Sequence, residues 1–205
     1  MLRDAQARKG QRAPPRAPRW ALTLRFRSRS MKNAAKELGG PVQAHMTTSF
    51  VPPPYPPCVV PLCDLAKTTI DDLVLETHHR GRYLLLRCVT PQDRMAAVMA
   101  IVEDEKGDAI LLQLYHQEHA DEMPEDILRE GLVLILKEPY LKCTADGGDG
   151  LRVDHVSDVE FLSSDDERIP DIWKQPAPEM GTATVWKLKG NEAFKKSEYR
   201  AAIEA

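Results

Sequence analysis

The chain has 205 residues, 42% of them hydrophobic, with 28 Lys and Arg against 31 Asp and Glu and a formal net charge of −3. This length suffices for one well-packed domain with flanking segments. No apolar run reaches the roughly 20 residues that a membrane-spanning helix needs, so we expect no membrane partner. Four cysteines without a disulfide framework favour a reducing compartment, and we expect a cytoplasmic or nuclear location.

The charge is distributed unevenly along the chain. Residues 1–45 carry 11 Lys and Arg against two acidic residues, a net charge of +9, whereas the remainder carries −12. The segment is rich in Arg, Ala, Pro and Lys and shows no sustained period of 2 or 3.6, so we predict a disordered basic tail. Prolines 14, 15 and 18 would also break an amphipathic helix here. A mitochondrial presequence is an alternative, since the segment is rich in Arg and poor in acids. The change of character at Met46 also allows an upstream extension of the start site.

A proline-rich linker is predicted over 46–63, and a β-rich domain over 64–162. Five segments of this domain have strand patterns and one polar segment has that of a helix. The strands are 83–89, 95–103, 109–115, 132–137 and 151–156, and the helix is 118–129. Their order resembles that of the OB-fold, a five-stranded Greek-key barrel with a helix between its third and fourth strands. A generic small β-barrel is the alternative. Asp104–Asp108 is predicted to be a hairpin turn with Gly107 at positive φ.

An OB-like barrel raises the question of nucleic-acid binding. Residues 64–164 carry 10 Lys and Arg against 21 Asp and Glu, and such a surface repels a phosphate backbone. Tyr83, Tyr115 and Tyr140 are interpreted as packing residues rather than a platform for bases. We therefore expect no nucleic-acid partner.

The reactive side chains form no recognisable metal or catalytic motif. The pairs His78–His79 and His116–His119 have no third ligand in a suitable pattern, and no Cys-x-x-Cys accompanies them. The sequence contains no phosphate-binding glycine loop, nucleophile elbow or His-Glu-x-x-His helix. We therefore expect no metal, no cofactor and no catalytic residue within this chain.

The C-terminal residues 183–205 follow a second predicted linker over 163–182 and have the pattern of a helical hairpin. The residues that carry this pattern are Trp186, Gly190, Phe194, Tyr199 and Ala202. They resemble the packing signature of the tetratricopeptide (TPR) repeat, whose length is about 34 residues. The segment supplies the beginning of such a repeat, and an amphipathic helix pair of no family is the alternative.

The resemblance to TPR repeats also implies a ligand. In chaperone-binding TPR domains a Lys and an Asn of the first repeat hold the C-terminal carboxylate of a chaperone, and Lys187 and Asn191 fall on the matching positions. Their ammonium and amide groups suit a carboxylate. We therefore expect protein or peptide partners, chaperone tails among them.

The order of an acidic OB-like region and a first TPR repeat resembles the N-terminal part of fungal proteins that carry TPR repeats followed by a SET domain. In that family the SET domain methylates lysine with S-adenosylmethionine, and none of its motifs occurs here. The predicted function is a non-catalytic protein-interaction module. The alternatives are the N-terminal region of a SET-domain lysine methyltransferase and, disfavoured by charge, an OB-fold nucleic-acid binder.

Overall fold

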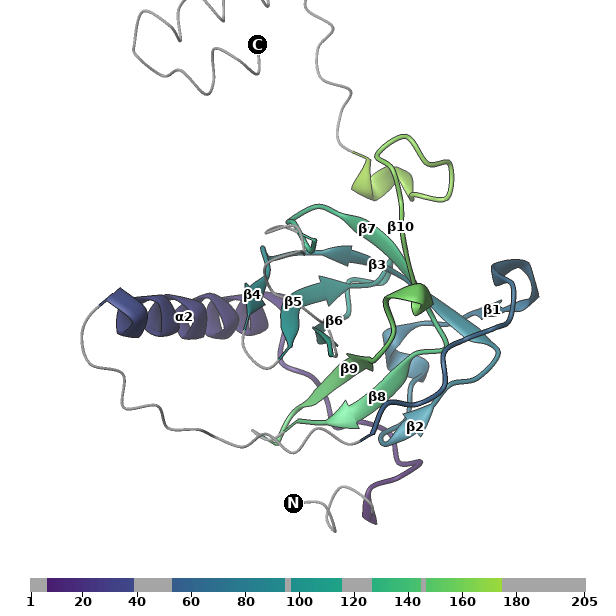
Figure 1. The fold of residues 1–205 in the computed structure, drawn as a ribbon, viewed down its shortest axis with the longest axis horizontal. Coiled ribbons are helices and arrows are strands. Elements are labelled where there is room, and N and C mark those ends of the chain that lie inside the picture. The colour runs from purple at the N-terminus through teal and green to yellow at the C-terminus, as the bar shows by residue number, and fades with distance from the viewer. Residues whose placement is uncertain (1–6, 39–52, 95–96, 116–126, 145–146, 175–205) are drawn as a thin grey trace, which may run out of the picture. The chain divides into compact units, whose positions relative to one another are not determined.

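The structure is a computed structural model that describes residues 7–38, 53–94, 97–115, 127–144 and 147–174. Over these residues it consists of a mixed sheet of ten strands and one long helix, α2 (Figure 1). The chain divides into two compact units, Met1–Pro170 and Asp171–Ala205, and the second is described only over 171–174. No helix in the described ranges is long and apolar enough to cross a membrane.

The helix α2 covers Arg19–Leu38. The strands are β1 (Ala66–Lys67), β2 (Thr77–His78), β3 (Arg82–Cys88), β4 (Asp93–Arg94), β5 (Val98–Glu103), β6 (Ala109–Leu114), β7 (Val133–Lys137), β8 (Tyr140–Cys143), β9 (Asp149–Val153) and β10 (Val159–Phe161). Short 3-10 helices are η1 (Leu62–Asp64), η2 (Ile70–Asp72), η3 (Val156–Asp158) and η4 (Asp171–Trp173).

The strand order is β10-β7-β3-β5-β6-β9-β8-β2, with β1 paired to β3 and β4 paired to β5. The pairs β6–β9 and β1–β3 are parallel, and the other pairs are antiparallel. Only Glu138 and Pro139 separate β7 from β8, yet β7 pairs with β3 and β8 pairs with β9. Because two residues cannot span a flat sheet of this width, the sheet curls until these distant positions meet.

The inner face of the curled sheet encloses the main core. Alternate residues of a strand point to opposite faces, and one set from each long strand enters this core. The largest fully buried members include Leu84, Leu86, Ile110, Leu112 and Leu136.

The outer face of β5 and β6 is also apolar, and α2 covers it (Figure 1). Every residue of β5 is buried, because Val98, Ala100 and Val102 face the inner core whereas Met99 and Ile101 face the helix. A strand that is apolar on both faces needs a second layer. That layer is supplied by Phe26, which is 5% exposed and packs on Met99 and Ile101 as one buried cluster.

The predicted fold class, a five-stranded OB-like barrel with one internal helix and a partial TPR hairpin, is wrong. The five predicted strand segments are strands β3, β5, β6, β7 and β9, but five further strands extend the sheet to ten. The added strands have two to four residues each and are too short to produce a period in the sequence. No helical hairpin is present in the described residues. The hairpin of 183–205 and most of the predicted helix at 118–129 lie outside them.

The prediction of a disordered basic tail is wrong for residues 19–38, which form α2. Pro18 is the last of the prolines that argue against a helix, and it lies immediately before the first residue of α2. The carbonyl of Pro18 accepts hydrogen bonds from Ala21 (2.9 Å) and Leu22 (3.2 Å), so the last proline begins the helix instead of breaking it. Leu22 and Phe26, four residues apart, then lie on the face that packs against the sheet.

The docking of α2 predicts a strong contrast between two aromatic residues. Phe26→Ala should lower the free energy of unfolding by about 3 kcal/mol, because it empties a buried site. Trp20→Ala should change it by less than about 0.5 kcal/mol, because Trp20 is 70% exposed on the same helix. Urea denaturation, with hydrogen exchange of the α2 amides, measures both. Equal effects of the two substitutions would contradict the docked position of the helix.

Candidate functional site

Residues 10–19 form a segment that crosses the surface of the β domain and leads into α2; it is called the basic arm here. Its start is fixed by main-chain pairing with residues 74–75. The Gly10 amide donates to the Leu75 carbonyl and the Leu75 amide donates to the Gln11 carbonyl, both at 2.8 Å. An isolated antiparallel bridge joins Arg12 to Val74. Three prolines stiffen the rest of the arm, since each fixes its own φ.

An ion pair with little solvent exposure holds the middle of the arm. The Nε of Arg16 donates to Oδ2 of Asp149 at 2.7 Å, and the two side chains are 13% and 10% exposed. Asp149 is the first residue of β9, so a strand end fixes its position. Salt screens the attraction within this buried pair less than it screens a surface ion pair. The contribution of a buried pair to stability depends more strongly on its geometry.

A second ion-pair cluster holds the end of the arm, where α2 begins. Glu103 closes β5 and its side chain is 3% exposed. Its Oε2 accepts from Nη1 of Arg19 at 2.7 Å, and its Oε1 accepts from Nε of Arg87 at 3.0 Å. A buried carboxylate needs such partners because removal from water disfavours its charge. The arm therefore supplies one of the two cations that compensate Glu103.

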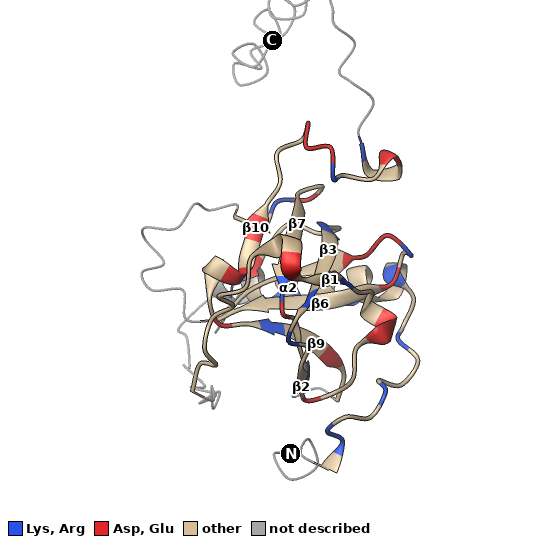
Figure 2. Ribbon diagram, turned by 90° about the vertical axis from the view of Figure 1, so that its right-hand side faces the viewer, with Lys and Arg blue, Asp and Glu red and all other residues tan. Residues whose placement is uncertain are grey.

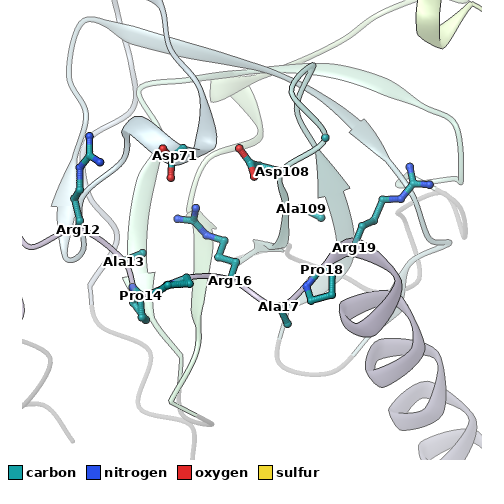
Figure 3. A pocket seen from close by; sticks show the side chains of 12 residues that line it. Arg12, Ala13, Pro14, Arg16, Ala17, Pro18, Arg19, Asp71, Asp108 and Ala109 are labelled. Carbon is teal, nitrogen blue, oxygen red and sulfur yellow. The ribbon is translucent and has the colours of Figure 1, made fainter.

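A cavity of about 400 Å³ lies between the arm and the sheet. Figure 3 shows Arg16 pointing into it between Asp71 and Asp108, with Arg12 and Arg19 towards the two ends of the arm. Among the described residues, Asp71 and Asp108 form no ion pair. Nη2 of Arg16 is buried and also has no partner within that part of the chain. The arm thus lies along an acidic groove, in which Asp71 and Asp108 line the cavity and Asp149 and Glu103 form the ion pairs with the arm.

The acidic wall is positioned by the turn between β5 and β6, which has the conformation predicted from the sequence. Gly107 adopts φ +85°. The buried Asp104 accepts hydrogen bonds from the amides of Ile70, Lys106 and Asp108 at 2.9 to 3.1 Å. It therefore ties the turn to η2 and holds Asp71 and Asp108 on the same wall of the groove. Figure 2 shows the complementary charges, blue along the arm and red on the sheet and its turns.

The histidines that the sequence singled out serve the fold in the described part of the chain. His79 accepts from the Val74 amide at 3.0 Å, and its Nδ1 lies 3.1 Å from the Pro139 carbonyl, so both ring nitrogens are engaged. His78 packs edge-on against Tyr55, with ring centroids 4.3 Å apart. No group of three potential metal ligands occurs in the described ranges. His116 and His119 lie outside them.

Two of the tyrosines predicted to be packing residues, Tyr115 and Tyr140, have hydrogen-bond partners within the domain. Tyr115 is buried and its hydroxyl accepts from Nζ of Lys142. Tyr140 donates to Oε2 of Glu76 at 3.1 Å.

The predicted TPR residues Trp186, Gly190, Phe194, Tyr199 and Ala202 lie outside the described residues, as do Lys187 and Asn191 of the predicted carboxylate site. Those site residues remain predictions. Sequence reasoning did not identify the groove residues Arg16, Arg19, Glu103 and Asp149. Two signals point to them: a carboxylate ending an otherwise apolar strand, and arginines recurring among prolines in 12–19.

Comparison with known proteins identifies one relative. Over 195 residues the chain is 47% identical to a protein named "Methyltransferase" from Gibberella zeae, a match that covers 94% of this chain and 25% of the relative. No family model matches the chain. The chain is therefore homologous to a part of a larger methyltransferase and spans about a quarter of that curated relative. Because 94% of the chain is matched, the match includes most of the basic residues 1–45.

A largely buried ion pair of the arm and an exposed ion pair of α2 predict different coupling energies in double-mutant cycles. The cycle of Arg16→Ala and Asp149→Ala should give about 1 to 3 kcal/mol, because the pair is largely removed from solvent. The cycle of Arg27→Ala and Glu130→Ala should give less than about 0.5 kcal/mol, since those side chains are 51% and 57% exposed. Urea denaturation at two salt concentrations measures both, and only the second should vanish at high salt. Indistinguishable couplings would contradict a seated arm.

His78 predicts a pH dependence of stability. Burial lowers its pKa from 6.5 to about 4, with a further contribution from the positive charge of Arg80. The folded state therefore binds fewer protons than the unfolded state between these values, and stability should fall as pH drops from 6.5 towards 4. In His78→Phe, which keeps a ring beside Tyr55, this part of the decrease should disappear. Parallel pH profiles of the two proteins in urea denaturation would contradict the assignment.

Proposed function

We propose that this chain is a non-catalytic region of a longer methyltransferase and that its β domain recognises protein segments. The homology to a quarter of a larger methyltransferase supports the first part. The acidic groove supports the second part, and it is the observation on which the proposal rests. An Arg- and Pro-rich segment lies along the groove and is held by main-chain pairing and by ion pairs to Asp149 and Glu103.

The reactive side chains of the β domain fit a recognition role. Burial raises the pKa of the Cys88 thiol to about 12, so the nucleophilic thiolate is suppressed at neutral pH. Burial and the nearby Glu76 carboxylate raise the pKa of Tyr140 to about 12, which keeps its phenol protonated. These groups act as packing and hydrogen-bonding residues.

The sequence resemblance suggests where methyl transfer takes place in the longer protein. The finer proposal is that the longer protein carries a SET domain, as the resemblance to fungal proteins with TPR repeats and a SET domain implies, and that this domain transfers the methyl group to lysine. Lysine acceptors lie in basic protein segments, and an acidic groove is complementary to such segments.

Titration with S-adenosylmethionine tests the non-catalytic assignment. Isothermal calorimetry of the 205-residue chain should show no binding at micromolar to millimolar cofactor, and no methyl group should be transferred to added basic peptides. The full-length relative from Gibberella zeae serves as the positive control and should bind the cofactor. Saturable cofactor binding by the 205-residue chain would overturn the proposal.

A further inference from the structure

We infer that the acidic groove is a binding site for a basic, proline-containing segment of another protein, and that the basic arm occupies it as a tethered competitor. The inference rests on the proposed recognition function and names the class of ligand. It concerns the acidic residues beneath the arm: Asp71 and Asp108 line the cavity, and Asp149 and Glu103 form the ion pairs with the arm.

The contacts that hold the arm can be reproduced by another chain. Main-chain groups of Gly10 and Gln11 form the pairing to Leu75, so another chain can reproduce it if a glycine stands at the first position, where φ is +75°. The arm also packs Ala13 against the main core and forms guanidinium–carboxylate pairs from Arg16 and Arg19, three residues apart. A segment with arginines at this spacing and prolines between them presents the same groups at a low cost in conformational entropy.

The groove offers more negative charge than the arm neutralises. Asp71 and Asp108 line the cavity and form no ion pair in the described part of the chain, and the cavity of about 400 Å³ has room for further side chains. A ligand with an additional Lys or Arg at this point would pair with these carboxylates. It could therefore bind the groove more tightly than the arm does.

Tethering determines how such a ligand competes. A segment joined to its site by a short connection acts at an effective concentration in the millimolar range. A free peptide of the arm's own sequence must approach that concentration to displace it. Weakening the arm alone, with the groove intact, should therefore reveal a site that the wild-type chain conceals.

The experiment uses a fluorescein-labelled peptide of residues 8–19, RKGQRAPPRAPR, and the full chain in three forms. Wild type should bind it only near millimolar peptide, because the arm competes. Arg16→Ala should bind it at least tenfold more tightly, because its own arm is loosened while Asp149 stays available. Arg16→Ala combined with Asp149→Asn should lose that gain, because the groove has lost a partner. A peptide with alanine at positions 12, 16 and 19 is the control ligand and should not bind any form.

Circular dichroism verifies that each variant is folded. A second measurement on the wild-type chain does not depend on the variants. With the chain labelled with ¹⁵N, excess unlabelled peptide should accelerate hydrogen exchange at the Gly10 amide, because the displaced arm releases its bond to Leu75. Equal peptide affinity in all three forms, or unchanged Gly10 exchange at saturating peptide, would overturn the inference. Either result would leave the cofactor titration, and with it the non-catalytic assignment, unaffected.

Discussion

The apolar outer face of β5 and β6 is the constraint on which the arrangement of the first 38 residues depends. The strands already use one face for the inner core, so Met99 and Ile101 on the other face would lie in water without a cover. Burying the Phe26 side chain against them contributes about 2 to 3 kcal/mol. Once α2 is fixed there, the preceding residues must cross the groove to reach it. The position of the arm therefore follows from hydrophobic packing as much as from charge.

Charge compensation then decides how closely the arm lies on the domain. Glu103 is at the end of a buried strand, where its carboxylate is nearly excluded from solvent. Arg87 from β3 supplies one cation within the sheet, and Arg19 supplies the second from α2. A buried carboxylate is stabilised only when its partners satisfy its oxygens. Glu103, the last residue of β5, thus joins the sheet to α2.

The sequence predicted the long strands because their period is visible, and it failed where tertiary contacts determine structure. β3, β5, β6, β7 and β9 have five to seven residues and strong apolar patterns. The strands of two to four residues exist because a neighbouring strand offers hydrogen bonds, and no local pattern marks them.

The prolines before Arg19 argue against a helix in this region, yet Pro is well tolerated at a helix start, and α2 begins directly after Pro18. The continuous apolar run of β5 contained the missing information, since it implies a second covering layer. The groove itself was not predictable from the sequence, because its residues come from segments more than 80 positions apart in the chain.

The covalent connection between the arm and its groove gives the acidic surface a definite role in a longer protein. Without the arm, the carboxylates of Asp71, Asp108 and Asp149 would attract any polycation, because long-range electrostatic attraction is non-specific. A tethered occupant at millimolar effective concentration excludes weak ligands, and only a segment with better pairing can replace it. The match to the relative from Gibberella zeae includes most of the basic region and most of the β domain. The arm thereby converts a broadly attractive surface into a selective one.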